Sequence, residues 1–331
     1  MKSIHLRSGR TFHIDSRISI LDAAALHSIS LPYSCKTGRC STCKSKVIDG
    51  ETEALQDETG LTAAEKAQGW ILSCVRTALT DLNLDVEDLN GVNVPKSKTL
   101  PCRIASIDKL APDVVRILLR LPPTADFYFI PGQYIDVIGP GGMRRSYSLA
   151  NASSEDKQLE LHIRAVDGGA MSRYWLDQAK VNDLLRLNGP LGTFFLRDVS
   201  GLDLAFLATG TGIAPVKAIL ASLNDLTSAQ QPRSVTVLWG GRTPEDLYFD
   251  VAAVSGGAKF VPVLSRADEL WMGARGYVQQ NLLMLLPDLS QAVVYACGSD
   301  AMIRDARITL TASGLPDHRF YSDAFVCSAA I

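Results

Sequence analysis

The spacing of hydrophobic residues divides the chain into three successive regions. In the first, short strand-like runs flank a stretch of helical spacing at residues 19–29, which predicts a small domain of strands and one principal helix. The next region carries strand-like runs at short intervals, separated by Pro and Gly, and this is typical of an antiparallel barrel. In the last region, continuous apolar strands alternate with helical stretches, which predicts a parallel α/β sheet.

These changes of pattern place the expected domain boundaries. Residues 1–90 form the first predicted domain. Residues 91–99 contain Pro, Gly and Lys without hydrophobic periodicity, and they are interpreted as a linker. The barrel is predicted over residues 100–198 and the α/β domain over residues 199–331. A chain of 331 residues is long enough for two or three domains.

Charge and hydropathy exclude several classes of protein. The formal net charge is −2, whereas a nucleic-acid binder usually carries a basic face or stripe. No apolar run reaches the roughly 18 residues expected of a membrane span. The early charged residues are not followed by the apolar core of a signal peptide. We therefore expect a cytoplasmic protein that binds neither nucleic acid nor membrane.

Four of the seven cysteines are grouped. Cys35, Cys40 and Cys43 follow the spacing C-x4-C-x2-C, with Cys74 further along, and this is the plant-type 2Fe–2S pattern. Four unrelated thiols or a zinc site are the alternatives, although zinc ribbons generally use paired short spacings. Gly38 lies within the loop, where a residue without Cβ lets backbone N–H groups approach sulfur. The remaining cysteines are Cys102, Cys297 and Cys327. For Cys102 and Cys327 we expect buried core thiols.

A second group of residues suits a flavin. Arg145, Tyr147 and Ser148 form an R-x-Y-S pattern on one predicted strand. They could supply positive charge for a pyrophosphate, a flat contact for the ring and a hydrogen bond to its edge. Gly169 permits close approach of the backbone, and Ser172 lies at the start of a predicted helix, where anions bind well. An ordinary surface strand is the alternative for the R-x-Y-S segment taken alone.

A third group of residues suits a nicotinamide nucleotide. Gly210, Thr211 and Gly212 follow a predicted strand and open a helix, so a tight turn meets a helix start. Cys297 and Gly298 end another predicted strand, and the carboxyl ends of strands are where α/β sheets bind ligands. A buried core thiol is the alternative for Cys297.

The order of these motifs resembles the ferredoxin–NAD(P)H reductase fusions, such as the reductase components of benzoate dioxygenase, phenol hydroxylase and soluble methane monooxygenase. The resemblance implies a multidomain fold: a β-grasp 2Fe–2S ferredoxin of the α+β class, an antiparallel β-barrel FAD domain and an α/β parallel-sheet NAD-binding domain. It implies that the four grouped cysteines are cluster ligands. The FAD contacts would then be Arg145, Tyr147, Ser148, Gly169 and Ser172. The residues beside the nicotinamide would be Gly210, Thr211, Gly212, Cys297 and Gly298. Phe325 matches the family's C-terminal aromatic residue, which can cover the flavin, although a core Phe is equally compatible.

Electron counting assigns an order to these cofactors. Nicotinamide delivers two electrons as hydride, a 2Fe–2S cluster accepts one at a time, and flavin can do both, so FAD must lie between them. We expect hydride transfer near Thr211, Cys297 and Phe325, with no acid–base residue. NADH is the expected donor, and NADPH remains possible. Arg266 or Arg242 could meet a 2′-phosphate, whereas Asp268 and Glu269 would oppose one.

A narrower resemblance concerns the electron acceptor. Several segments resemble the CDP-6-deoxy-Δ3,4-glucoseen reductases, namely 33–44, 119–125, 131–137, 144–152, 189–195 and 320–326. The resemblance implies electron delivery to an iron–sulfur dehydratase that acts on a CDP-4-keto-6-deoxyhexose in 3,6-dideoxysugar biosynthesis. An oxygenase component is the alternative partner, and a redox-sensing binding module is a third, more remote interpretation. Ser299 follows Gly298 where the family usually has Pro, and we expect a slightly altered loop there.

Overall fold

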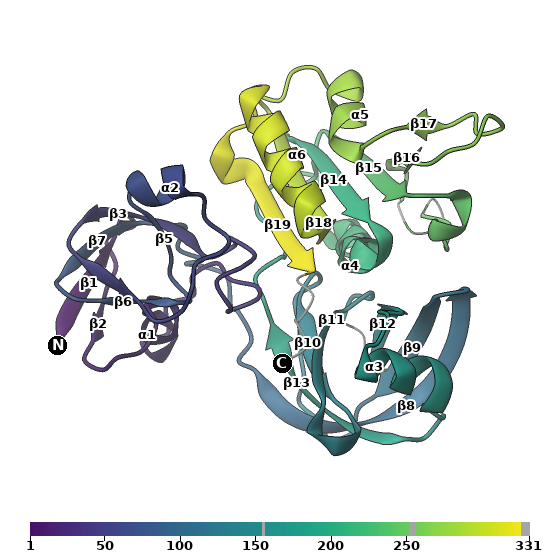
Figure 1. The fold of residues 1–331 in the computed structure, drawn as a ribbon, viewed down its shortest axis with the longest axis horizontal. Coiled ribbons are helices and arrows are strands. Elements are labelled where there is room, and N and C mark those ends of the chain that lie inside the picture. Colours follow the sequence, from purple (N-terminus) through teal and green to yellow (C-terminus); the bar gives the residue numbers. More distant parts are fainter. Residues whose placement is uncertain (154–155, 252–253, 255, 326–331) are drawn as a thin grey trace. The chain divides into compact units, whose positions relative to one another are not determined.

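The structure is a computed structural model that describes residues 1–153, 156–251, 254 and 256–325 (Figure 1). Cys327 lies outside the described residues. The described chain forms two compact units, residues 1–94 and residues 95–325. Among the described residues, no helix combines the length and apolar character needed to cross a membrane.

The N-terminal unit is a mixed sheet packed on one helix. The sheet has the order β2-β1-β7-β3-β5; β1 and β7 are parallel, and the other pairs are antiparallel. Its strands are β1 (Lys2–Leu6), β2 (Thr11–Ile14), β3 (Lys44–Asp49), β5 (Trp70–Leu72) and β7 (Leu82–Asp85). Helix α1 (Ile20–Leu26) begins at Ser19, whose hydroxyl accepts the Asp22 N–H, an N-cap that satisfies one free donor. This α+β arrangement confirms the predicted β-grasp domain.

Three short elements of this unit were not predicted from sequence. Strands β4 (Thr52–Ala54) and β6 (Arg76–Ala78) form a separate antiparallel pair. Helix α2 (Ala63–Ala67) begins at Thr62 with a capping box made by Glu65. Each element has five residues or fewer, too few for a hydrophobic period to show.

An antiparallel barrel opens the second unit. Its strands have the order β11-β10-β13-β8-β9-β12, and an antiparallel bridge between Leu149 and Leu161 joins the two ends. The strands are β8 (Lys98–Ala111), β9 (Val114–Arg120), β10 (Tyr134–Ile138), β11 (Arg144–Ser148), β12 (Gln158–Arg164) and β13 (Leu184–Leu191). Helix α3 (Ala170–Arg173) continues into the π-helical turn η2 (Tyr174–Gln178). The predicted antiparallel barrel is confirmed.

A six-stranded parallel sheet follows, in the order β17-β16-β15-β14-β18-β19. Its strands are β14 (Asp203–Thr209), β15 (Ser234–Gly241), β16 (Lys259–Leu264), β17 (Ala274–Arg275), β18 (Ala292–Ser299) and β19 (Phe320–Phe325). The helices are α4 (Ile213–Ser222), α5 (Val278–Leu285) and α6 (Asp300–Ala312). Short helical turns are η1 (Pro140–Gly142), η3 (Gly210–Gly212), η4 (Leu223–Asp225), η5 (Pro244–Asp246) and η6 (Asp317–Arg319).

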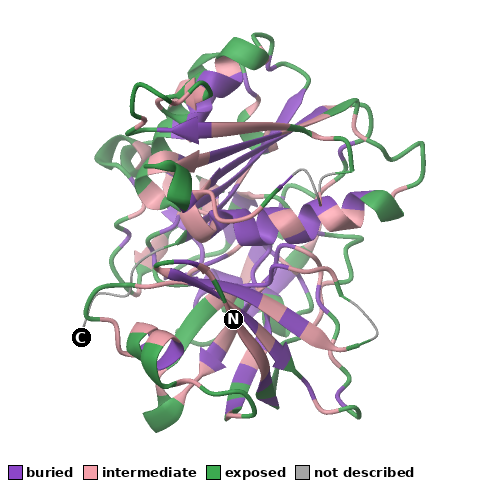
Figure 2. Ribbon diagram, turned by 90° about the vertical axis from the view of Figure 1, so that its right-hand side faces the viewer, coloured by how far each residue is buried: buried purple, intermediate pink, exposed green. Residues whose placement is uncertain are grey.

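The central strands of the parallel sheet are its most buried part. The central strands β14 and β18 are buried along almost their whole length (Figure 2), as expected for parallel strands covered on both faces. Because β14 and β18 pair in parallel from Asp203 to Ala208, their carboxyl ends meet at one edge. The predicted α/β domain is therefore confirmed, and it brings the two nicotinamide motifs to the same edge of the sheet.

Candidate functional site

Three of the four grouped cysteines, Cys35, Cys40 and Cys43, lie on the loop that connects α1 to β3, and Cys74 lies between β5 and β6. Gly38 has a left-handed φ of +73°, and a Cβ at this position would lie 2.3 Å from the Asp57 carbonyl oxygen. Gly60 donates its N–H to the Gly38 carbonyl at 2.9 Å, and Ser41 Oγ donates to the Gly60 carbonyl at 2.5 Å. The loop is therefore held closely against residues 57–60, and only glycine fits at position 38.

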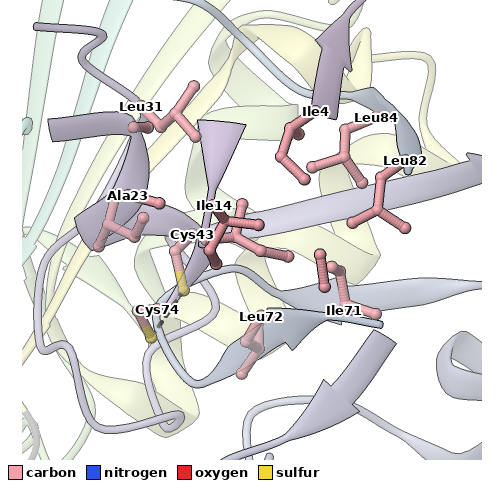
Figure 3. Packing of buried hydrophobic residues seen from close by; sticks show 14 of the residues in the cluster. Ile4, Ile14, Ala23, Leu31, Cys43, Ile71, Leu72, Cys74, Leu82 and Leu84 are labelled. Atoms are coloured by element: carbon pink, nitrogen blue, oxygen red, sulfur yellow. Dashed lines mark hydrogen bonds between the residues drawn. The ribbon is translucent and has the colours of Figure 1, made fainter. Parts of the chain in front are cut away.

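The four thiols form two neighbouring pairs. The Sγ atoms of Cys43 and Cys74 are 3.1 Å apart, and Figure 3 shows them side by side at the edge of the hydrophobic core. In the other pair, the Cys35 N–H donates to Cys40 Sγ at 3.4 Å. The backbone N–H of Thr37 donates to Cys35 Sγ, also at 3.4 Å. The fold thus brings the remote Cys74 to the loop, as the spacing required.

The thiol pairs already favour partial deprotonation. A hydrogen bond from Cys40 lowers the pKa of Cys35 to about 4. The corresponding bond from Cys43 lowers the pKa of Cys74, and the Gly38 backbone N–H acts in the same direction. The same hydrogen bonds raise the pKa of the partner thiols, Cys40 and Cys43, well above the ordinary value. Because metals bind the thiolate and not the thiol, ligation by all four cysteines would release these remaining protons.

The arrangement of the four thiols suits a cluster ligated by cysteine. Within the described part of the chain, no three His, Cys, Asp or Glu side chains gather as ligands of one ion. Two pairs of thiols, with backbone N–H groups directed at sulfur, suit a cluster held by four thiolates. Gly60 and Ser41 support the loop and were not identified from sequence, because their partners lie far apart along the chain.

The candidate flavin strand is β11, at one end of the barrel sheet. Tyr147 is half-buried and Arg145 is exposed. Trp175 Nε1 donates to the Tyr147 hydroxyl at 2.9 Å, and the two rings meet edge to face with centroids 6.1 Å apart. Burial raises the pKa of Tyr147 to about 12, so its hydroxyl stays protonated. Trp175, which fixes the Tyr147 ring, was not singled out from sequence.

Gly169 and Ser172 shape the turn before α3. The Ser172 hydroxyl accepts the Val166 N–H at 2.9 Å, and a Cβ on Gly169 would lie 3.0 Å from that hydroxyl oxygen. Ser172 therefore holds the turn together, and its hydroxyl hydrogen can still donate to another group. Since Trp175 follows in the next turn, this segment and the Tyr147 strand are joined by a direct hydrogen bond.

The candidate nicotinamide turn, Gly210–Gly212, packs directly on the end of β18. A Cβ on Gly212 would lie 2.2 Å from the Cys297 carbonyl oxygen and 2.8 Å from the Gly298 nitrogen. Trp239 Nε1 donates to the Gly210 carbonyl at 3.0 Å and so holds the other end of the turn. The structure thus brings both predicted glycine motifs together, and Trp239 is a support that sequence did not reveal.

Cys297 lies near the end of β18, and Phe325 ends the neighbouring strand β19. The Cys297 side chain is fully buried, and burial raises its thiol pKa well above the ordinary value, so it is not a reactive thiolate. Phe325 pairs with Ser299 in the register of β18 and β19 and is 37% exposed. This exposure argues against a core Phe and leaves its ring accessible beside the Cys297–Gly298 strand end.

Ser299 makes a bond that proline could not make. Its backbone N–H donates to Thr209 Oγ1 at 3.2 Å, and its side chain accepts the Met302 N–H to begin α6. Proline has no N–H to donate. The serine therefore links the end of β18 to the residue before the Gly210 turn.

Comparison with family models assigns a domain type to each region. Residues 4–79 match the 2Fe-2S iron-sulfur cluster binding domain. Residues 101–196 match the oxidoreductase FAD-binding domain, and residues 206–307 match the oxidoreductase NAD-binding domain. The three matches follow the chain in the order that the motifs indicated.

Known proteins resemble the chain over nearly its full length. A Yersinia pestis protein, CDP-6-deoxy-L-threo-D-glycero-4-hexulose-3-dehydrase reductase, is 42% identical over 97% of both chains. Reductase component 2 of terephthalate 1,2-dioxygenase from Comamonas sp. is 31% identical, covering 93% of this chain and 92% of that protein. Among solved structures, the ferredoxin reductase in carbazole 1,9a-dioxygenase has a TM-score of 0.68 at 26% identity, with 98% of each chain covered.

Proposed function

Because the chain belongs to the family of oxidoreductases that join a 2Fe–2S domain to FAD-binding and NAD-binding domains, we propose that it passes electrons from NADH to a dehydratase acting on a CDP-linked 4-keto-6-deoxyhexose. The observation that carries this proposal is the 42% identity to the Yersinia pestis dehydrase reductase over 97% of both chains. The terephthalate dioxygenase reductase component is 31% identical, so the likeness to the sugar-pathway protein is stronger.

Arg145, Tyr147, Ser148 and Ser172 would hold an FAD, which would supply the conversion of a hydride from NADH into single electrons for a 2Fe–2S cluster. In our proposal, Cys35, Cys40, Cys43 and Cys74 hold the cluster. The loop around Gly38 directs backbone N–H groups at sulfur, and such bonds help to set the reduction potential. No side chain has to move a proton in the electron-transfer steps, so we assign no general acid or base.

The flavin and nicotinamide contacts are proposed from the two pre-formed motifs. Tyr147, fixed by Trp175, offers its ring to the flavin, and Ser148 lies beside it at the end of β11. The exposed guanidinium of Arg145 is available for a pyrophosphate, as is the hydroxyl hydrogen of Ser172. Thr211 lies between two glycines whose packing brings the turn against Cys297 and Gly298, where a nicotinamide ring can approach the backbone closely.

NADH is the proposed donor. The charged side chains near β16 determine whether the protein can also bind the 2′-phosphate that distinguishes NADPH from NADH. The Arg242 guanidinium is engaged by Asp246, with its Nε 3.0 Å from Oδ2. Asp268 accepts backbone N–H groups of its own loop through Oδ1. Arg266 is exposed, and no ion pair occupies its side chain in the part of the chain that the structure describes. It is therefore the cation best able to meet a 2′-phosphate.

Arg266→Ala is expected to lower kcat/KM for NADPH by about 10-fold or more and to leave NADH within about twofold, because a charged contact to phosphate is worth roughly 1.5–3 kcal/mol. The measurement is kcat/KM for both nucleotides in the wild type and the variant. A wild-type preference for NADPH that collapses in Arg266→Ala would refute the proposed use of NADH.

The acceptor is tested by reconstitution. Purified protein mixed with a glucoseen-forming dehydratase and its CDP-sugar should give NADH-dependent deoxygenation at C3, measured by mass spectrometry of the sugar product. A parallel mixture with a purified oxygenase component should give no coupled turnover. Turnover with the oxygenase component alone would reject the dehydratase as partner and support the oxygenase alternative.

We also propose a cytoplasmic location, since the six described cysteines are all unpaired and such thiols suit a reducing compartment.

A further inference from the structure

One strand of the barrel presents an unusual row of polar side chains. In β12, Leu159, Leu161 and Ile163 are buried in the barrel core. The alternating residues are Glu160, His162 and Arg164. Because successive side chains of a strand point to opposite faces, these three residues share the face away from the barrel interior. Each of them contacts the α/β domain within the same compact unit.

The central contact is made by Lys217 of helix α4. Its ammonium group donates to Glu160 Oε2 at 2.7 Å and to the Ala150 carbonyl at 3.1 Å. The Lys217 side chain is only 20% exposed and that of Glu160 only 13%. Burial alone would raise the pKa of Glu160, but hydrogen bonds from His162 and Lys217 outweigh it and lower the pKa to about 2. Glu160 is therefore ionised at neutral pH and matches the lysine charge.

Two further contacts extend this connection along β12. His162 Nε2 bonds to Glu160 Oε1 at 2.7 Å, and His162 Nδ1 bonds to the Tyr248 hydroxyl at 3.1 Å. At the carboxyl end of the strand, Arg164 pairs with Asp246 at 3.0 Å. A Cβ on Gly210 would lie 3.5 Å from Arg164 Nη1. The polar face of β12 therefore connects the barrel to the α/β domain beside the nicotinamide turn.

Lys217 and its acceptor Ala150 each lie close in sequence to one of the two candidate cofactor segments. Lys217 lies one helical turn beyond Ile213, the residue that follows the Gly210–Gly212 turn. Its second acceptor, Ala150, lies two residues beyond Ser148, at the end of the flavin strand. One side chain thus connects the segment proposed to hold the nicotinamide to the segment proposed to hold the flavin.

We infer that Lys217 and Glu160 are positioning residues for hydride transfer, which hold the nicotinamide turn at the correct distance from the flavin strand. The inference rests on the proposed placement of the two cofactors. Hydride transfer requires the reacting atoms in a near-attack arrangement, and a displacement of about 1 Å can cost about 100-fold in rate. Loosening this connection should therefore slow hydride transfer more than it weakens NADH binding.

The test compares Lys217→Met with Lys217→Arg in the full-length holoprotein. Rapid mixing with NADH gives the limiting rate of flavin reduction and the Kd for NADH, and hydrogen exchange reports on residues 149–151. We expect Lys217→Met to slow flavin reduction by about 10- to 100-fold with the Kd changed by less than about threefold. Exchange at residues 149–151 should rise. Lys217→Arg, which keeps the charge and has donors enough for both Glu160 and Ala150, should keep the rate within about threefold of the wild type.

Lys98→Met is the matched control, because it removes another lysine ion pair of the same unit, with Asp126 at 2.6 Å. The Lys98 side chain is 47% exposed, and its loss should leave flavin reduction and exchange at residues 149–151 unchanged. A Lys217→Met protein that reduces its flavin at the wild-type rate would overturn the inference. An arginine variant as slow as the methionine variant would also overturn it.

A wrong nicotinamide site and a wrong role for Lys217 would give different results in Gly212→Ala. If the nicotinamide does not bind at the Gly210–Gly212 turn, Gly212→Ala should leave both the flavin reduction rate and the Kd for NADH unchanged. If only the positioning role is wrong, Gly212→Ala should impair NADH reduction while Lys217→Met behaves as the wild type.

Discussion

Cys74→Ala is expected to lose the 2Fe–2S cluster and to retain reduction of its flavin by NADH. Cys74 is the remote member of the four thiols, and its Sγ lies 3.1 Å from that of Cys43. Three thiolates cannot complete the ligand set of a cluster normally held by four. The flavin and nicotinamide residues belong to the other compact unit, so the hydride step should survive. Iron analysis, the electron paramagnetic resonance (EPR) signal after reduction, and anaerobic flavin bleaching by NADH measure the two outcomes separately.

Cys102→Ala is the matched control. Cys102 is also buried, at 1% exposure, but it lies in strand β8 of the barrel core. Its loss should leave the iron content and the EPR signal unchanged. If Cys74→Ala kept a full complement of iron and the same signal, the proposed ligand set would be wrong.

Gly212→Ala is expected to lower kcat/KM for flavin reduction by NADH about 100-fold or more, while dithionite still reduces the flavin. The added Cβ would lie 2.2 Å from the Cys297 carbonyl oxygen and 2.8 Å from the Gly298 nitrogen. Both are backbone atoms that cannot rotate aside, so the turn must move away from β18. A shift of about 1 Å between donor and acceptor is enough to cause a loss of this size.

The control for this substitution is Gly314→Ala. Gly314 follows α6 in the same α/β domain, and a Cβ there meets nothing within 4 Å, although its φ is +98°. Left-handed backbone costs roughly 1–2 kcal/mol for an L-residue, so a small loss of stability with unchanged kcat/KM is expected. Equal kcat/KM values in Gly212→Ala and the wild type would contradict the proposed nicotinamide turn.

Sequence patterns predicted the three fold classes, because each region has a distinct hydrophobic period. They missed β13, although it pairs with both β8 and β10. Its sequence contains Gly189 and Pro190, which usually mark turns. In the barrel these two residues lie near the end of a strand whose Leu185 and Leu187 are buried. Tertiary packing, which a local pattern does not reveal, thus outweighs the turn signal.

In the candidate site too, only the locally encoded features could be predicted from sequence. The cysteine spacing and the glycine turns could be recognised because backbone geometry and ligand chemistry constrain local sequence. Supporting residues such as Trp175, Thr209 and Lys217 could not be recognised, since each acts through a partner from another segment. A lysine in the middle of α4 carries no signal of its own until Glu160 and Ala150 are brought beside it.

Electron transfer from NADH through FAD to the cluster is tested most directly by an anaerobic titration of the wild-type protein with NADH, followed by visible absorption and low-temperature EPR. NADH should bleach the flavin and then produce the signal of a reduced 2Fe–2S cluster, and Cys74→Ala should give the bleaching alone. A wild-type protein with its full complement of iron and FAD, whose flavin bleaches while the cluster stays oxidised, would contradict electron transfer from NADH through FAD to the cluster.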